Sequence, residues 1–194
     1  MKKAATILII ASALLSSGFS GKGRWVIGDE SRLTIHGSTN INSFTCEMTC
    51  YTGSDTLLYE KNYEACEIRF HRNSMTIPVR SFDCGARQIS KDFWKTLKSE
   101  TYPQLDIQFR SLQNISVKDN TFIKGVIDIT LAGVTTRYTV RYHVDVMKGS
   151  TILLKGMHPV NFSDFKLEAP EKMRGLIRVK EVLNVEFNLV LKAV

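Results

Sequence analysis

The sequence lacks long hydrophobic runs, clustered histidines and the short motifs of common catalytic sites. Its longest apolar run, residues 4–15, spans about a dozen residues, whereas a membrane-spanning helix needs about 20. The histidines, His36, His71, His143 and His158, are too dispersed for the spacing of a metal site. Neither a G-x-S-x-G motif nor a P-loop occurs. We therefore predict no stable membrane insertion, no catalytic residue, no metal ligand and no cofactor.

Charge of one sign is also not concentrated anywhere along the chain. The 26 Lys and Arg residues exceed the 19 Asp and Glu residues, for a formal charge of +7. A nucleic-acid-binding surface requires basic residues gathered on one element with aromatic residues between them. Here they are scattered singly, as at Arg32, Lys61 and Lys124. The pattern is typical of a solvated surface and argues against nucleic-acid binding.

The N-terminus has the layout of an export signal. Lys2 and Lys3 precede the apolar run, and small residues follow it as far as Ser20. We therefore expect residues 1–20 to be a signal peptide and residues 21–194 to form one domain. The predicted location is the periplasm or the exterior of the cell.

Alternation of apolar and polar residues is the dominant pattern in the rest of the chain. It predicts half-buried strands, and short turn signals such as Ala132-Gly133 favour antiparallel neighbours. The count is eight to ten strands in an all-β fold, which can close into a barrel or stack as a sandwich. The exception is residues 90–100, where Ser90 as N-cap, the spacing of Phe93, Trp94 and Leu97, and the following Tyr-Pro predict one short helix. The clearest alternating segments are residues 42–50, 66–71, 105–110, 123–131, 137–146 and 183–191.

Four segments in order resemble the YceI-like family of exported bacterial lipid-binding proteins. They are STNINSFTC at residues 38–46, IPVRSFDCGARQISKDFWKTLKSETYPQLDIQF at 77–109, GVIDITLAGVTTRYTV at 125–140, and DFKLEAPEKMRGLIRVKEVLNVEFNLVL at 164–191. The resemblance implies a lipocalin-like antiparallel β-barrel of about eight strands with one short inserted helix. It also implies that the lumen holds an isoprenoid-type lipid, such as a quinone tail or a polyisoprenol.

The inward-facing apolar residues of such a barrel are the candidate ligand-binding residues. The same residues would serve equally as an ordinary packed core, because periodicity does not separate the two. The helix likewise belongs either to the core or to the cavity entrance. The candidates are Phe44, Met48, Ile68, Phe70, Phe93, Trp94, Leu97, Phe109, Ile127, Ile129, Tyr138, Tyr142 and Phe187.

The four cysteines predict disulfides, because the count is even and the protein is expected to be exported. Cys46 and Cys50 lie about 13 Å apart along a regular strand and cannot bridge each other. Together with the family-like blocks, this favours Cys46 with Cys84 and Cys50 with Cys66. One disulfide with two free thiols, or a metal site, are the alternatives.

The expected function is binding, sequestration or transport of a long apolar lipid, with no enzymatic activity. Each isoprene unit would contribute about 3–4 kcal/mol at roughly 0.8 kcal/mol per carbon, against an association cost of about 4–15 kcal/mol. About four or more buried units are therefore expected for tight binding. The alternative is a periplasmic enzyme or stress-response interaction protein with a filled barrel. The sequence leaves homodimerisation open.

Overall fold

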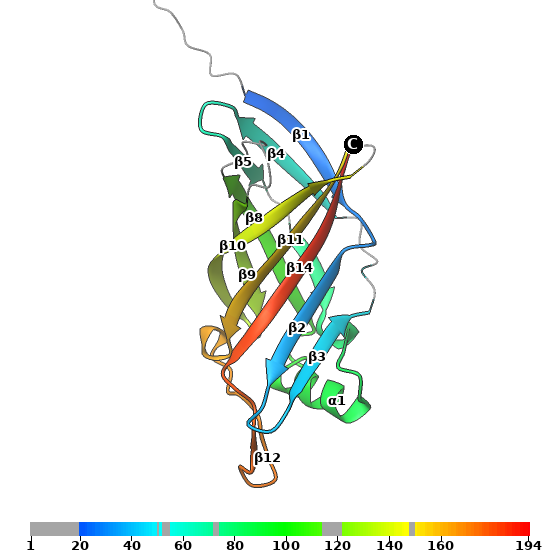
Figure 1. Cartoon of the computed structure of the whole chain (residues 1–194), viewed down its shortest axis with the longest axis vertical. Coiled ribbons are helices and arrows are strands. Elements are labelled where there is room, and N and C mark those ends of the chain that lie inside the picture. The colour runs from blue at the N-terminus through cyan, green and yellow to red at the C-terminus, as the bar shows by residue number, and fades with distance from the viewer. Residues whose placement is uncertain (1–19, 50, 52–54, 72–73, 114–121, 148–149) are drawn as a thin grey trace, which may run out of the picture.

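The computed structural model describes residues 20–194 apart from 50, 52–54, 72–73, 114–121 and 148–149. The described residues are mostly antiparallel strands, with one α-helix, α1 (Arg87–Thr96), and two short 3-10 helices, η1 (Val79–Ser81) and η2 (Ser163–Phe165) (Figure 1). The strands are β1 (Ser20–Ile27), β2 (Arg32–Ser38), β3 (Ser43–Met48), β4 (Thr56–Asn62), β5 (Glu67–His71), β6 (Ser74–Pro78), β7 (Phe82–Asp83), β8 (Gln104–Gln113), β9 (Ile123–Leu131), β10 (Val134–Val146), β11 (Thr151–Asn161), β12 (Glu171–Lys172), β13 (Ile177–Arg178) and β14 (Val182–Ala193).

The main sheet closes on itself. Strands β1, β4, β5, β8, β9, β10, β11 and β14 follow one another in hydrogen-bonded order, and β1 also pairs with β14. At two positions of the barrel wall, two shorter strands together pair with one long strand: β1 and β2 both pair with β14, and β5 and β6 both pair with β8. The result is the expected antiparallel barrel of about eight strands, built as an up-and-down meander.

The alternation of side chains explains the barrel. In β8, Leu105, Ile107 and Phe109 are buried while Gln104 and Arg110 face outward. A register shift between Phe109 and Ser111 inserts one residue, after which Leu112 is buried. Figure 1 shows that the long strands cross the molecule obliquely, as barrel closure requires.

The tight turn between β9 and β10 uses left-handed backbone conformations. Ala132 has a φ of 50° and Gly133 a φ of 79°, and Leu131 lies directly opposite Val134. Two consecutive left-handed residues give a turn whose twist matches that of the strands. The turn predicted from Ala132-Gly133 is confirmed.

The single helix is confirmed, but its predicted start is wrong. Helix α1 begins at Arg87 after Ala86 as N-cap, so Ser90 lies inside the helix. The Ser90 hydroxyl accepts a hydrogen bond from the backbone N–H of Cys84, at 3.0 Å. The Ser90 side chain therefore binds the backbone of the loop before α1. This explains why a residue type that is common at helix starts lies one turn inside the helix.

The disulfide between Cys46 and Cys84 is present and joins β3 to the residue after β7. The predicted bond between Cys50 and Cys66 is wrong in this structure, because Cys66 is a free, exposed cysteine in the β4–β5 turn; Cys50 lies outside the described residues. The preceding Thr49 donates its backbone N–H to Ser81. Ser81 follows β6, which ends opposite Gln104 of β8, whereas Glu67, next to Cys66, lies opposite Gln113. At about 3.3 Å per residue, these two positions on β8 are roughly 30 Å apart, so Thr49 and Cys66 lie toward opposite ends of the barrel.

The two ends of the barrel differ. At one end, called the helix end here, lie α1, η2, the β2–β3 turn and the β12–β13 hairpin (Figure 1). The other, the distal end, holds Ser20, the β4–β5 turn and the C-terminus. In the described part of the chain, no helix is long and apolar enough to cross a bilayer. The predicted signal peptide falls outside the described residues except for Ser20, which begins β1.

Candidate ligand-binding site

An apolar groove of about 230 Å³ lies at the helix end. Three elements form its walls: the β2–β3 turn, one side of α1, and the β12–β13 hairpin with its flanking segments. Aliphatic and aromatic side chains cover most of its surface. The lining residues are Thr39, Ile41, Asn42, Ser43, Phe44, Ile89, Asp92, Phe93, Thr96, Phe162, Pro170, Lys172, Ile177 and Val179.

Polar contacts fix the walls of the groove to one another. The Asn40 side chain donates to the carbonyl of Leu176 and accepts from the backbone N–H of Arg178, both at 2.9 Å. On the other side, the Lys172 ammonium lies 2.7 Å from an Asp92 carboxylate oxygen of α1. These bonds hold the hairpin against both the β2–β3 turn and the helix, so the groove is preformed.

Phe44 forms one wall of the groove because Gly37 leaves room for its ring. The two residues lie opposite each other in the β2–β3 pair. A Cβ atom at position 37 would collide with the Phe44 ring. The glycine therefore leaves room for the Phe44 ring, which lines the groove.

A second apolar space, of about 50 Å³, lies inside the barrel beneath the groove. Its walls are entirely apolar and come from α1, η2 and six strands. Phe93 lines both the groove and this cavity. The residues around the cavity are Leu33, Ile35, Phe82, Phe93, Leu97, Leu105, Ile107, Ile129, Leu131, Val160, Phe165, Leu183, Val185 and Phe187.

The Phe93 ring is therefore the partition between the groove and the barrel interior. It is 6 % exposed, and its ring packs edge-on against Phe82 at 5.9 Å. Phe93 and Leu97 are four residues apart and lie on the same side of the helix, toward the barrel. Phe93 is the residue that the two linings share.

A half-buried carboxylate anchors η2, which contributes Phe165 to the wall of the cavity. Asp164 in η2 accepts hydrogen bonds from the Tyr138 hydroxyl at 2.8 Å and from the backbone N–H of Asn161 at 3.0 Å. Burial alone would raise the pKa of Asp164, but these hydrogen bonds outweigh it and the pKa is lowered. This contact fixes η2, which places Phe162 in the groove and Phe165 in the cavity.

Toward the distal end, aromatic rings pack against one another. The ring centroids of Trp25 and Tyr59 are 4.5 Å apart, those of Trp25 and Phe70 are 6.0 Å apart, and those of Phe70 and Phe109 are 6.1 Å apart. Such spacings are typical of close-packed aromatic cores. This part of the barrel is occupied by its own side chains.

Tyr142 places a polar group in the barrel interior. It is 1 % exposed, and its hydroxyl has no hydrogen-bond partner among the described residues. Burial raises its pKa well above the ordinary value, so the hydroxyl stays protonated. A Cβ at Gly125 or Gly156 would press into the ring, which lies 6.2 Å from that of Phe187.

The structure brings only part of the predicted set into these two spaces. Phe44 lines the groove, Phe93 lines both spaces, and Leu97, Ile129 and Phe187 line the cavity. The remaining barrel residues lie buried in the core outside these two linings, and their role in binding stays a prediction. These are Met48, Ile68, Phe70, Phe109, Ile127, Tyr138 and Tyr142.

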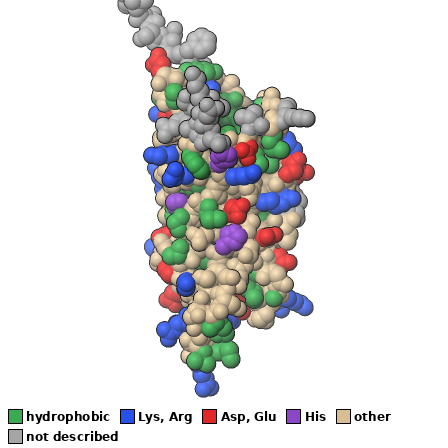
Figure 2. All heavy atoms as spheres, viewed as in Figure 1, with side chains coloured by type: hydrophobic (Ala, Val, Ile, Leu, Met, Phe, Trp, Pro, Cys, Tyr) green, Lys and Arg blue, Asp and Glu red, His purple; other side chains and the backbone are tan. Residues whose placement is uncertain are grey.

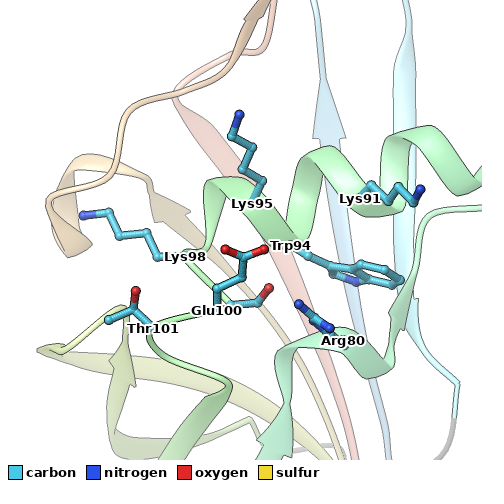
Figure 3. A pocket seen from close by; sticks show the side chains of 8 residues that line it. Arg80, Lys91, Trp94, Lys95, Lys98, Glu100 and Thr101 are labelled. Carbon is cyan, nitrogen blue, oxygen red and sulfur yellow. The ribbon is translucent and has the colours of Figure 1, made fainter.

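Trp94 points away from the cavity. One residue of helix turns the side chain by about 100°, so Phe93 and Trp94 cannot face the same way. The Trp94 indole N–H donates to the carbonyl of Phe82 at 2.9 Å, and its ring lines an outer hollow with Arg80 and Lys91 (Figure 3). Its role in ligand binding also stays a prediction.

Sequence reasoning missed the groove residues of the hairpin and of η2. Ile177 and Val179 belong to a strand and a bridge too short to show alternation. Phe162 is the N-cap of the 3-10 helix η2, and Phe165 is its last residue. The sequence feature that could have pointed to these residues was an apolar residue at every second or third position in a segment rich in turns. That signal does not reveal which side of the barrel they cover.

The comparison with known families agrees with this architecture. The model of the YceI-like domain matches residues 61–191 of the chain. The chain belongs to the YceI-like family. The matched region runs from the end of β4 through β14 and contains α1, η2 and the β12–β13 hairpin. No curated protein matches the sequence at a significant level.

Solved structures share the fold at low sequence identity. A polyisoprenoid-binding domain from Saccharophagus degradans, implicated in plant cell wall breakdown, is 15 % identical, with a TM-score of 0.65 over 90 % of this chain and 100 % of that one. BcnA from Burkholderia cenocepacia is 18 % identical, with a TM-score of 0.61 over 82 % and 95 %. The YCEI protein of Campylobacter jejuni is 16 % identical, with a TM-score of 0.52 over 69 % and 78 %.

Within the described residues, no group of three or more His, Cys, Asp or Glu side chains is arranged to hold a metal ion. The helix-end site offers an apolar contact surface, and a few polar side chains such as Asn42 and Lys172 also line the groove. Such a surface is suited to binding an apolar molecule.

Proposed function

We propose that this protein binds a long apolar chain of the isoprenoid type, such as a quinone tail or a polyisoprenol, at the helix end of the barrel. It would act as a carrier or sequestering protein exported to the periplasm or beyond, and not as an enzyme. The observation that carries the proposal is the position of Phe93, whose ring separates an apolar groove from an apolar cavity. A chain lying in the groove is one side chain away from the barrel interior.

The chemistry of the lining supports an apolar ligand. The cavity has no polar surface, and the charged residues Lys172 and Asp92 of the groove are paired with each other. Each buried carbon of a prenyl chain contributes roughly 0.8 kcal/mol. The family relationship adds support, because the relative from Saccharophagus degradans is described as a polyisoprenoid-binding domain.

The dimensions indicate how binding would proceed. The groove of 230 Å³ and the cavity of 50 Å³ together fall near the lower limit of about 300 Å³ for small-molecule sites. A long chain therefore requires Phe93 and its neighbours to move aside. In this proposal the first units occupy the groove, and later units enter the barrel as Phe93 rotates.

A titration with prenyl alcohols of two, four and eight units tests the proposal. Affinity is expected to increase with chain length, since the association cost of about 4–15 kcal/mol is met only when several units are buried. The same affinity for the two-unit and eight-unit alcohols, or no binding of either, would overturn it.

Two matched substitutions locate the site. Ile177→Lys places a charge in the groove and is expected to weaken binding of the eight-unit alcohol at least tenfold. Met157→Lys changes an exposed residue on β11, outside the groove, and is expected to leave binding within about twofold. Equal effects of both substitutions would contradict a site at the helix end.

A second candidate function is favoured by the packed interior. The aromatic rings around Trp25 and Phe70 and the small size of the cavity also suit a barrel that acts through its outer surface, as an interaction protein. Lipid mass spectrometry of the protein purified under native conditions separates the two functions. Co-purified isoprenoid supports the carrier, whereas a lipid-free protein that binds no prenyl alcohol supports the interaction protein.

A further inference from the structure

The tip of the helix end exposes large apolar side chains to solvent. Ile41 in the β2–β3 turn is 64 % exposed, and Met173 and Leu176 in the β12–β13 turn are 67 % and 70 % exposed. The two turns are joined by the hydrogen bonds of Asn40, so these residues belong to one surface. Figure 2 shows hydrophobic side chains gathered at this lower tip of the molecule. Exposed apolar patches rimmed by polar residues mark interaction surfaces.

The backbone of this tip is held in an unfavourable conformation. Met173 and Arg174 have φ values of 52° and 55°, and Gly175 follows at 85°. Left-handed conformations suit glycine or asparagine, and they cost free energy for methionine and arginine. Local stability therefore does not account for an exposed methionine at this position.

Basic residues surround the apolar tip. The segment 171–180 contains Lys172, Arg174, Arg178 and Lys180 against the single acidic residue Glu171. Beside the hairpin, Lys91 and Lys95 of α1 and Lys98 just after it line an open hollow of about 630 Å³ together with Arg80, Trp94, Ser99, Glu100 and Thr101. In Figure 3 the Lys91 and Lys95 side chains extend away from α1. Two of these charges are paired, Lys172 with Asp92 at 2.7 Å and Arg178 with Glu171 at 3.4 Å. Within the described residues, Arg174, Lys180, Lys91 and Lys95 form no ion pair and supply the positive charge of this surface.

We propose that the helix end docks onto the surface of an anionic lipid bilayer, with Ile41, Met173 and Leu176 inserted among the headgroups. The lysines and arginines around them lie against lipid phosphates, and the half-buried Trp94 sits at headgroup depth, where tryptophan is favoured. The combination of a small apolar tip and a basic rim is typical of proteins that lie on membranes without crossing them.

In this orientation the groove lies next to the bilayer surface. Ile41 lines the apolar groove as well as the exposed tip, so the groove opens beside the surface that contacts the bilayer. A lipid could then pass between the membrane and the groove without crossing water. The docking proposal does not depend on the proposed cargo, because bilayer binding is measurable on the protein without any isoprenoid.

Vesicle co-sedimentation tests the proposal. The purified protein is mixed with vesicles of phosphatidylcholine alone or with 30 % phosphatidylglycerol. We expect at least about tenfold tighter binding to the anionic vesicles, and loss of that preference at high salt, where surface charges are screened. Equal binding to both vesicle types, or none to either, would overturn the proposal whatever the result with prenyl alcohols.

Two pairs of variants locate the docking surface. The substitutions Lys91→Gln, Lys95→Gln, Arg174→Gln and Lys180→Gln are expected to weaken binding at least about tenfold, since each basic residue near an anionic surface contributes about fivefold. The matched control, Lys22→Gln, Arg24→Gln, Lys124→Gln and Arg141→Gln, removes equal charge at exposed positions toward the distal end and is expected to change binding less than threefold. Similar losses in both variants would overturn the proposal.

The apolar tip is tested in the same assay. Ile41→Ser, Met173→Ser and Leu176→Ser together are expected to weaken binding about tenfold, whereas Phe122→Ser, Met147→Ser and Met157→Ser, also at exposed positions, are expected to leave it within threefold. Analytical ultracentrifugation of the same proteins tests the other occupant, a second copy of the chain. A dimer that only the tip variant dissociates would assign the surface to self-association and overturn membrane docking.

Discussion

The two ends of the barrel are built from the same alternating strands but differ in how their interiors are packed. Toward the distal end, Trp25, Tyr59, Phe70 and Phe109 fill the interior with rings in mutual contact. At the helix end, the strands are covered by α1, η2 and a short hairpin, and a groove and a cavity remain between these pieces. Strands alone pack a barrel closely, whereas attached elements leave space where their surfaces meet.

The largest expected effect distinguishes the packing of the two regions. Phe109→Ala removes a ring from the close-packed region and is expected to lower the free energy of unfolding by about 4–5 kcal/mol. Phe93→Ala is expected to cost only about 3 kcal/mol, because one side of that ring already borders empty space. Urea unfolding measures both. A larger cost for Phe93→Ala would reverse the comparison.

The disulfide stabilises the helix end in particular. Replacing Cys46 and Cys84 by alanine opens a loop closed over a sequence separation of 38 residues and is expected to lower the free energy of unfolding by about 2–4 kcal/mol. Hydrogen exchange should increase first in β3, β7 and α1. Cys66→Ser, which removes the exposed free thiol, is the control and is expected to change nothing. Uniformly faster exchange throughout the barrel would show that the bond has no local role.

Acid sensitivity gives a second local test at the helix end. The pKa of Asp164 is lowered in the folded protein, so its carboxylate stabilises the fold above its ordinary pKa, and this stability is lost as the pH falls through the folded pKa. Asp164→Asn is expected to lower the free energy of unfolding at pH 7 by about 1–3 kcal/mol and to flatten its decline in acid.

Asp128 is the matched control for this test. On the outer wall of the barrel, Arg137 and Arg110 lower its pKa to about 2, so its contribution disappears between about pH 4 and about pH 2. Asp128→Asn should also flatten the acid decline but leave the groove intact. If Asp128→Asn changed prenyl alcohol binding as much as Asp164→Asn, the role of Asp164 in holding η2 would be wrong.

The smallest expected effect concerns the two interior tyrosines. The Tyr142 hydroxyl has no partner among the described residues, so Tyr142→Phe is expected to raise the free energy of unfolding by up to about 1 kcal/mol. Tyr138→Phe removes the hydrogen bond to Asp164 and is expected to lower it by about 1–2 kcal/mol. Thermal unfolding of both variants measures the difference. Equal losses would show that the Tyr142 hydroxyl is satisfied in solution.

The long strands could be predicted from the sequence because each of them alternates over many residues. β8 and β14 have an apolar side chain at nearly every second position, and Ala132-Gly133 marked a turn. The Cys46–Cys84 bond was also predictable from segments that resemble the family. The general architecture therefore followed from local patterns and a few motifs.

The site was less predictable, because its residues come from elements with no periodic signal. The two-residue strands β12 and β13 show no alternation. The apolar stripe of α1 did not reveal that Phe93 faces the barrel while Trp94 faces outward. Cys66 illustrates the same limit: its sequence spacing suited a disulfide, but the hairpin turn places it at the far end from Thr49.

Photo-cross-linking tests most directly the claim that the helix end is the entrance for an apolar chain. An eight-unit prenyl alcohol carrying a diazirine at its hydroxyl end would be bound, irradiated and mapped by peptide mass spectrometry. We expect cross-links at groove residues such as Phe44, Ile89 and Ile177, and their loss in Ile177→Lys. Cross-links confined to the region around Trp25 and Tyr59, or unchanged by Ile177→Lys, would contradict the account.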